Sequence, residues 1–188
     1  PGELNDRAWW TRQLSSFGPQ PKGHDKVLRG IHSAVFSWSL PDSETLATVA
    51  EFTRGTRLRS YGAGSALWER LLQDHFDIPV MATDYNLRHR FLEVQIEDFS
   101  DAEINESDTI FLAWIISGNT SVLNILKKMR VNQRLVFIGE PPSRRRQSGI
   151  CASPAVFAYL REYFTLEKTL PLVNYSHLND TCSFYRKH

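Results

Sequence analysis

Short apolar runs alternate with amphipathic helical patterns through the middle of the chain. The apolar runs occupy residues 57–61, 78–84, 91–96, 108–115 and 134–140. The clearest helical patterns cover residues 65–76, 120–130 and 153–164. Strands separated by helices need crossover connections, so this order predicts a mostly parallel sheet with helices on both faces.

The flanking segments add a helix and a different kind of strand pair. Residues 42–55 follow helical spacing and start with Asp42 or Ser43, either of which can cap a helix. The last two apolar runs, 165–176 and 180–188, are joined by a short polar turn, which predicts antiparallel pairing. The predicted fold class is therefore α/β, a doubly wound and mostly parallel seven-stranded sheet with a C-terminal antiparallel strand pair.

Residues 1–35 differ from the rest of the chain. We interpret them as an N-terminal helical or extended segment that precedes one domain, residues 36–188. Within the segment, residues 7–17 can form a short helix, and the turn-rich residues 18–25 would end it.

Composition indicates a globular protein and excludes some classes. The 188 residues are 41% hydrophobic, 12% aromatic and 23% charged, unlike a disordered chain. A net charge of +1 excludes polyanion binding driven by overall charge, although a local basic patch remains open. Cys151 and Cys182 do not form a CxxC pair, and no apolar run reaches about 18 residues. We therefore expect free thiols, no membrane span and an intracellular location, cytoplasmic or nuclear.

The main candidate for a binding site lies where the first predicted strand ends. Gly62-Ala63-Gly64 closes the apolar run, and a helical pattern follows directly. This arrangement presents backbone N–H groups at the carboxyl edge of the sheet, where α/β proteins bind ligands. Asp84 lies twenty residues after Gly64, at the end of the next run. A carboxylate at that place can accept hydrogen bonds from both hydroxyls of a ribose.

Two kinds of adenosine-bearing ligand fit this pattern, a dinucleotide and S-adenosylmethionine. The dinucleotide fingerprint has a third glycine three residues after the second, and this chain has Leu67 there. The terminal antiparallel pair also argues against a dinucleotide-binding oxidoreductase. S-adenosylmethionine is therefore the favoured cofactor, and the oxidoreductase is the weaker alternative.

At these residues the chain resembles the seven-stranded S-adenosylmethionine-dependent methyltransferases, over about residues 35–188. More narrowly, it is similar to a methyltransferase-like group with an aromatic-Pro segment before the first helix and GAG-x-x-x-Trp after the first strand. The segments that carry the likeness are FSWSLPDSETLATVAEF, YGAGSALWERLL, ATDYN, IFLAWII and LVFIGEPP. The resemblance implies a methyltransferase-like Rossmann fold and methyl transfer to an acceptor that the sequence does not identify.

The resemblance also implies roles for individual residues. The implied cofactor contacts are Gly62, Ala63 and Gly64 along the methionine part, Asp84 at the ribose, Asp98 near the adenine amino group, and Ala113 and Trp114 beside the transferred methyl. From its place in the sequence, Tyr85 either stacks on the purine or remains a half-exposed loop residue. Glu140, flanked by an apolar run and Pro-Pro, could act as a base or orient a substrate. Trp114 and Glu140 are therefore the catalytic candidates. The six histidines show no metal-ligand spacing, so no metal is expected.

Three places depart from the family pattern. Ser60 replaces the acid that commonly helps to hold the amino-acid end of the cofactor, and we count it among the cofactor-binding candidates at that place. The third glycine of G-x-G-x-G is Ala66. The fourth strand run ends in AWII, without the polar clamp of methyltransferases that act on amino nitrogens. These departures motivate a second hypothesis, a domain that has lost turnover and acts as a binding or scaffold module.

Two features suggest surfaces for a partner. Arg144, Arg145 and Arg146 form a concentrated basic run, and Trp9 with Trp10 places two large rings on a short segment. A solvated loop and a folded-back segment are the structural interpretations. Contact with RNA or with a partner protein is the functional one. The pattern does not indicate an oligomeric state.

Overall fold

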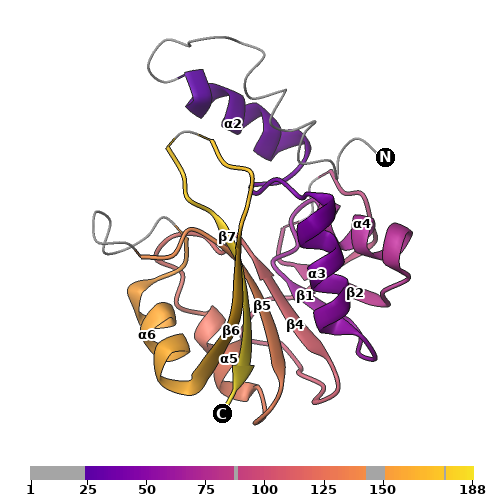
Figure 1. The fold of residues 1–188 in the computed structure, drawn as a ribbon, viewed down its shortest axis with the longest axis vertical. Coiled ribbons are helices and arrows are strands. Elements are labelled where there is room, and N and C mark those ends of the chain that lie inside the picture. The colour runs from indigo at the N-terminus through magenta and orange to yellow at the C-terminus, as the bar shows by residue number, and fades with distance from the viewer. Residues whose placement is uncertain (1–23, 87–88, 143–150, 176) are drawn as a thin grey trace.

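The computed structural model describes residues 24–86, 89–142, 151–175 and 177–188, which form one seven-stranded sheet with its helices (Figure 1). The strands are β1 (Leu58–Tyr61), β2 (Val80–Asp84), β3 (Val94–Ile96), β4 (Thr109–Ala113), β5 (Arg134–Gly139), β6 (Phe164–Pro171) and β7 (Thr181–Lys187). The helices are α2 (His24–Val35), α3 (Ser43–Thr53), α4 (Leu67–Phe76), α5 (Val122–Lys128) and α6 (Pro154–Tyr163). The helix expected at residues 7–17 lies outside the described residues.

The strand order confirms the predicted doubly wound sheet. It runs β3-β2-β1-β4-β5-β7-β6, with β1 to β5 parallel and β7 antiparallel to both β5 and β6. β1 lies between β2 and β4, so the chain crosses over in opposite directions on the two sides of β1. In an open parallel sheet, ligands bind at the carboxyl ends of the strands beside such a switch point.

The core lies on both faces of the sheet because side chains alternate along each buried strand. On β4, Ile110 and Leu112 pack with α5 and α6, whereas Phe111 packs with α3 and α4. Figure 1 shows the same division, with α3 and α4 on one side of the strands and α5 and α6 on the other. These apolar runs lack polar alternation because helices cover both faces of the strands that they form.

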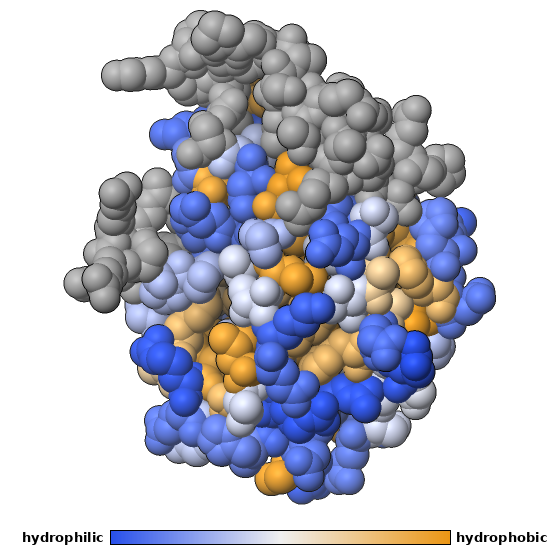
Figure 2. Space-filling model, in the orientation of Figure 1, coloured by the Kyte–Doolittle hydropathy of each residue, from blue (hydrophilic) through white to orange (hydrophobic). Residues whose placement is uncertain are grey.

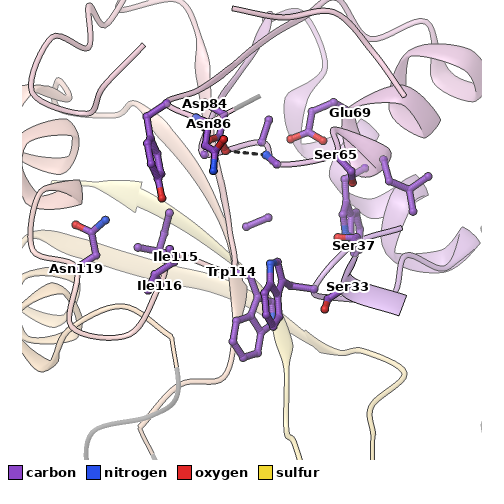
Figure 3. A pocket seen from close by; sticks show the side chains of 18 of the residues that line it. Ser33, Ser37, Ser65, Glu69, Asp84, Asn86, Trp114, Ile115, Ile116 and Asn119 are labelled. Carbon is purple, nitrogen blue, oxygen red and sulfur yellow. Dashed lines mark hydrogen bonds between the residues drawn. The ribbon is translucent and has the colours of Figure 1, made fainter. Parts of the chain in front are cut away.

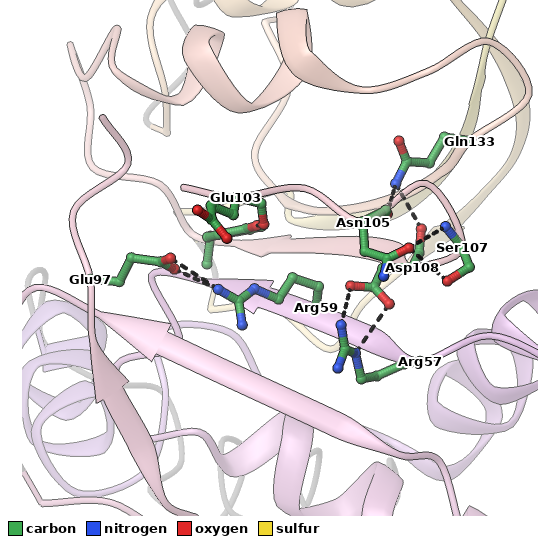
Figure 4. A network of polar contacts seen from close by, with 9 residues as sticks. Arg57, Arg59, Glu97, Glu103, Asn105, Ser107, Asp108 and Gln133 are labelled. Atoms are coloured by element: carbon green, nitrogen blue, oxygen red, sulfur yellow. Dashed lines mark hydrogen bonds and ion pairs between the residues drawn. The ribbon is translucent and has the colours of Figure 1, made fainter. Parts of the chain in front are cut away.

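A polar network joins the strands from within the sheet (Figure 4). Just before β1, Arg57 donates to both carboxylate oxygens of the buried Asp108 just before β4, at 3.1 and 2.8 Å. On β1 itself, the buried Arg59 pairs with Glu97 at 2.8 Å. Arg59 of the RLRSY run is thus buried because a carboxylate receives its charge, whereas Arg57, whose side chain is 41% exposed, lies at the edge of the fold.

The surface of the described chain is mixed in polarity. In the orientation of Figure 1, hydrophobic residues appear in small separate groups among hydrophilic ones (Figure 2). Among the described residues, no helix is both long and apolar enough to span a bilayer. Cys151 and Cys182 are free and buried, as the sequence predicts.

Helix α2 lies within residues 1–35, the segment expected to be helical or extended, and it begins inside the turn-rich residues 18–25. The helix rests on the loop between β6 and β7, where Nδ1 of His32 and the hydroxyl of Tyr175 are 2.7 Å apart. Leu40, which follows the helix, forms an isolated bridge with Val173 in the same loop. The boundary between residues 35 and 36 stays a prediction, and α2 nevertheless packs on the sheet domain.

Candidate functional site

A cavity of about 540 Å³ opens at the carboxyl ends of β1, β2 and β4, at the switch point of the sheet (Figure 3). Its walls come from the glycine loop after β1, the tips of β2 and β4, the segment after β3, and the end of α2. The predicted site residues among its lining are Gly62, Ala63, Gly64, Asp84, Tyr85, Asp98, Ala113 and Trp114. Sequence-based prediction therefore placed most of its candidates around one cavity.

The glycine loop leaves space beside Gly64, but its N–H groups are engaged within the protein. Those of Gly62 and Ala63 both donate to the carbonyl of Thr83, at 2.8 and 3.0 Å, and that of Gly64 donates to Asp84. The sequence-based expectation that these N–H groups are presented to a ligand is therefore wrong.

Gly62 and Gly64 both have positive φ, +72° and +57°, which side chains adopt at a cost. A Cβ at Gly62 would lie 3.1 Å from the ring of Phe99. The missing side chain at this glycine therefore makes room for Phe99, and not for a ligand. A Cβ at Gly64 would meet no atom within 4 Å. The open approach is therefore at Gly64.

Ala66, the residue in place of the third glycine, also adopts the left-handed conformation. It has a φ of 55° and is the N-cap residue of α4. A glycine would take this conformation without strain, which gives a physical reason for the glycine in the family pattern. The loop keeps its shape here with an alanine.

Asp84 closes the cavity at the tip of β2 with both carboxylate oxygens engaged by backbone. Oδ2 accepts from the N–H of Gly64 at 2.9 Å, and Oδ1 accepts from the N–H of Asn86 at 2.8 Å. Figure 3 shows Asp84 and Asn86 side by side at the rim. Each carboxylate oxygen can accept a second hydrogen bond, so the group remains able to bind hydroxyls.

A second buried carboxylate, Glu69, faces the cavity and was missed from the sequence. It lies in the first turn of α4 and accepts a 2.5 Å hydrogen bond from the hydroxyl of Ser60, while its side chain lines the cavity (Figure 3). Only 2% of Glu69 is exposed, and burial raises the pKa of its carboxyl to about 7. Its sequence signal is an acid among the apolar positions of an amphipathic helix.

Ser60 itself does not belong to the described lining of the cavity. It is a buried residue of β1, and its hydroxyl donates a hydrogen bond to Glu69, which does line the cavity. A carboxylate, that of Glu69, thus lies within hydrogen-bond distance of the residue at which the family pattern has an acid.

The side of the cavity towards β2 and β3 contains Tyr85, Asp98 and Phe99. Tyr85 is 63% exposed, which leaves its ring accessible. Asp98 is exposed and accepts from the N–H and the hydroxyl of Ser100, both at 2.8 Å. These hydrogen bonds lower the pKa of Asp98, so its carboxylate is ionised.

The tip of β4 carries the most constrained residue of the cavity. Trp114 has a φ of +52°, a conformation that bulky side chains seldom adopt, and its backbone N–H donates to Ile138 at 2.8 Å. Its ring stacks on Trp38 with centroids 5.8 Å apart, and its indole N–H donates to Asp180 at 2.8 Å. Trp38, which sequence reasoning also missed, joins Ser33, Ala34 and Ser37 from the α2 side of the lining.

Glu140, the other catalytic candidate, is buried at the end of β5 and is not among the described lining residues. The side-chain amide of Asn179 donates to its carboxylate at 3.5 Å. Its negative charge also helps to raise the pKa of Asp180, whose burial is the larger cause. A role for Glu140 in chemistry stays a prediction. The basic run Arg144 to Arg146 and the pair Trp9–Trp10 lie outside the described residues.

Comparison with known proteins gives a likeness in fold. No family model matches the chain, and no curated protein matches its sequence. Solved structures do match. A mutant of MtNAS in complex with S-adenosylmethionine is 13% identical, with a TM-score of 0.56, over 96% of this chain and 76% of that one.

Two further structures share the fold over nearly their whole length. The N-methyltransferase NodS from Bradyrhizobium japonicum, solved with S-adenosyl-L-homocysteine, is 14% identical, with a TM-score of 0.53, over 97% of this chain and 98% of that one. A geranyl diphosphate methyltransferase in complex with S-adenosylmethionine is 9% identical, with a TM-score of 0.54, over 90% and 92%. The chain therefore has the Rossmann-like fold of S-adenosylmethionine-dependent methyltransferases. Identities this low establish the fold alone.

Proposed function

We propose that the cavity binds S-adenosylmethionine and that the protein transfers its methyl group to an acceptor. The observation that carries the proposal is the open space beside Gly64 with the Asp84 carboxylate next to it, at the switch point of a methyltransferase fold. The structures of similar fold that were solved with S-adenosylmethionine or S-adenosylhomocysteine support it.

The residues present fit such a ligand from end to end. Gly62, Ala63 and Gly64 would lie along its methionine part, and Asp84 would accept from the ribose hydroxyls with its remaining lone pairs. Tyr85 and Asp98 would lie at the adenine end.

Glu69 fits the charged end of the ligand. An amino acid carries an ammonium group, and a buried carboxylate that faces a cavity is a suitable partner for it. We assign Glu69 as the partner of this ammonium group, in the role of the acid that the family pattern has at the position of Ser60. Because burial raises the pKa of the free Glu69 to about 7, we expect a bound ammonium to favour its ionised form.

Methyl transfer needs little acid–base machinery from the protein. Bound S-adenosylmethionine supplies an activated methyl on a sulfonium. The protein has to align the acceptor with that methyl and exclude water. Ala113 and Trp114, at the tip of β4, would form the wall beside the methyl. Trp38, which stacks on Trp114 and is 45% exposed, would form the outer edge of this wall.

Calorimetric titration with S-adenosylhomocysteine tests the proposal. We expect saturable binding, a raised melting temperature, and at least a tenfold loss of affinity in Asp84→Asn, because the variant loses the charge that receives the hydroxyls. Asp101→Asn, an exposed acid of the neighbouring loop, is the matched control and should bind as the parent protein does. No binding by the folded parent protein would reject the proposal, and equal affinities for the two variants would reject the role of Asp84.

Binding without turnover is the remaining alternative, a scaffold module of the same fold. Ser60, Ala66 and AWII motivate it from the sequence, and Glu69 weakens the first of these reasons because a carboxylate is present after all. Incubation with S-adenosylmethionine labelled at the methyl, with cell extract as the source of acceptors, separates the two. Label that stays on the cofactor despite tight binding would favour the scaffold.

A further inference from the structure

Arg29 of α2 lies against the two stacked tryptophans that line the cavity. Its guanidinium carbon is 4.2 Å from the ring centroid of Trp114 and 4.8 Å from that of Trp38. The faces of tryptophan rings attract cations at such distances. Asp180, which accepts the indole N–H of Trp114, adds a buried carboxylate behind the rings. We call Trp38, Trp114 and Asp180 the cation site.

The cation site holds Arg29 without completing its hydrogen bonds. Nε and Nη2 of Arg29 are buried and have no acceptor among the described residues. Asp180 is only 3% exposed, and its Oδ1 has no donor there either. Buried polar atoms without partners are rare and costly. Arg29 is therefore a poorly satisfied occupant that a better-fitting cation can displace.

The backbone of Trp114 points to a function for the cation site. Its left-handed conformation is strained for a residue with a bulky side chain. The stack on Trp38 and the bond to Asp180 hold it in place. Strained residues of this kind cluster at functional sites. The indole of Trp114 both lines the cavity and contacts Arg29 in the cation site.

The charges of the cavity favour a cationic ligand. Glu69, Asp84, Glu97 and Asp98 line it, and no lysine or arginine is found among its described lining. Arg59 neutralises Glu97 through their ion pair, which leaves an excess of carboxylates. A negative cleft attracts positive ligands and repels phosphate-bearing ones. At this mouth, an amine or guanidine is favoured over a phosphorylated partner.

We propose that Trp38, Trp114 and Asp180 bind a positively charged nitrogen group, an amine or a guanidine, and that Arg29 occupies this site in cis when the ligand is absent. The identity of the bound group as the methyl acceptor rests on the proposed function. The binding of the cation does not, because the site is complete without a cofactor.

Asp180 can take the proton that a protonated nitrogen has to lose before it accepts a methyl group. An amine acceptor would give one proton to the Asp180 carboxylate, and its freed lone pair would form the bond to the methyl carbon. Bound S-adenosylmethionine would supply that methyl, and the electron pair of the broken carbon–sulfur bond would stay on its sulfur. The methylated nitrogen would then carry the positive charge, and the proton would pass from Asp180 to water. A guanidine would bind as a cation, because its protonated form is too weak an acid to give a proton to a carboxylate. Oδ1 of Asp180, which has no donor among the described residues, is the atom free to take the proton.

Titration of the full chain with ethylguanidinium, in the absence of cofactor, tests the cation site. Tryptophan fluorescence and calorimetry report binding, and ethylurea is the uncharged probe of similar shape. We expect Arg29→Met to bind ethylguanidinium at least tenfold more tightly than the parent protein, because the internal competitor is gone while its aliphatic packing is kept. Lys26→Met removes an exposed charge from the same helix and should behave as the parent protein does.

Asp180→Asn, placed in the Arg29→Met background, keeps an acceptor for the indole N–H and removes the charge. We expect it to lose at least tenfold in affinity for ethylguanidinium. Arg29→Gln is the second variant if Arg29→Met does not fold. Equal affinity of the Arg29 and Lys26 variants, no effect of Asp180→Asn, or equal binding of ethylurea would each overturn the cation site.

The two proposals fail separately. S-adenosylhomocysteine binding that is intact in a protein that does not bind ethylguanidinium rejects the cation site alone. The reverse result rejects the proposed function and leaves the cation site standing. Asp84→Asn should weaken the binding of S-adenosylhomocysteine at least tenfold and change the affinity for ethylguanidinium by less than Asp180→Asn does, because Asp84 lies outside the cation site.

Discussion

At the residue scale, Glu69 shows how a neighbouring element can bring a carboxylate to a position where the sequence has none. The sequence pattern counts an acid as lost at Ser60, because it compares only positions along β1. In three dimensions the first turn of α4 passes beside that strand, and Glu69 reaches the hydroxyl of Ser60 at 2.5 Å. A carboxylate can thus be present at the same place in a cavity while it comes from another position in the sequence.

The raised pKa of Glu69 predicts a pH-dependent stability of the free protein. Its carboxyl goes from an ordinary 4.5 to about 7 on folding, chiefly through burial, with the charge of Asp84 adding to the rise and the Ser60 hydroxyl opposing it. Between these values the unfolded chain releases the proton that the folded protein keeps. Stability therefore falls as pH rises through this window, by about 3 kcal/mol in full.

Glu69→Gln removes that titration. We expect urea unfolding to show the variant gaining on the parent protein by about 2–3 kcal/mol between pH 5 and pH 8. Glu51→Gln, at an exposed site on α3, should show no such change. A constant difference between the Glu69 variant and the parent protein at both pH values would mean that Glu69 is already ionised in the free protein.

At the element scale, helix α3 settles an alternative that the sequence left open. Asp42 and Ser43 both suit an N-cap, and the structure selects Asp42. Its carboxylate accepts from the N–H and the hydroxyl of Thr45 at 3.0 and 3.1 Å. Ser43 is exposed as the first residue of the helix. Capping depends on which residue leaves the helical conformation first, and that is set by the packing of the preceding segment.

The cap predicts a difference between two neighbouring variants. We expect Asp42→Ala to lower the free energy of unfolding by about 1–2 kcal/mol, because a buried helix start loses its acceptor. Ser43→Ala should change it by less than about 0.5 kcal/mol. Denaturant unfolding at pH 7 measures both. Equal losses for the two variants would contradict the assignment of the cap.

At the scale of the whole molecule, α2 joins the N-terminal segment to the cavity. Its end supplies Ser33 and Ala34 to the lining, and Arg29 contacts Trp38 and Trp114. A domain boundary at residue 35 would therefore divide the lining of the cavity, because Ser33 and Ala34 lie before it and the other lining residues lie after it.

A chain of residues 36–188 tests this view of the boundary. We expect it to unfold cooperatively, because both faces of its sheet keep their helices. We also expect its affinity for S-adenosylhomocysteine to fall by at least threefold, since one wall of the cavity is lost. Calorimetry and thermal unfolding report the two properties. Loss of cooperative unfolding would contradict the boundary, and unchanged affinity would exclude α2 from the site.

Most of the fold was predictable because it depends on local patterns. Apolar runs such as 108–115 and 134–140 must be buried on both faces, and the helical spacing between runs leaves crossover connections as the solution. The bounds of α2 were not predicted, although residues 1–35 were expected to be helical or extended. Its place is decided by contacts with the loop between β6 and β7.

The sequence alone therefore determined the sheet, its helices, and the carboxyl edge where Gly64 and Asp84 meet, because strand ends in a parallel sheet share one side. Tertiary structure decided the rest. It brought Glu69 to Ser60, placed Arg29 over Trp38 and Trp114, and set Asp180 behind them across 66 residues of chain. Contacts between residues so far apart leave no periodic trace in a sequence, because only the packing of whole elements determines which side chains meet.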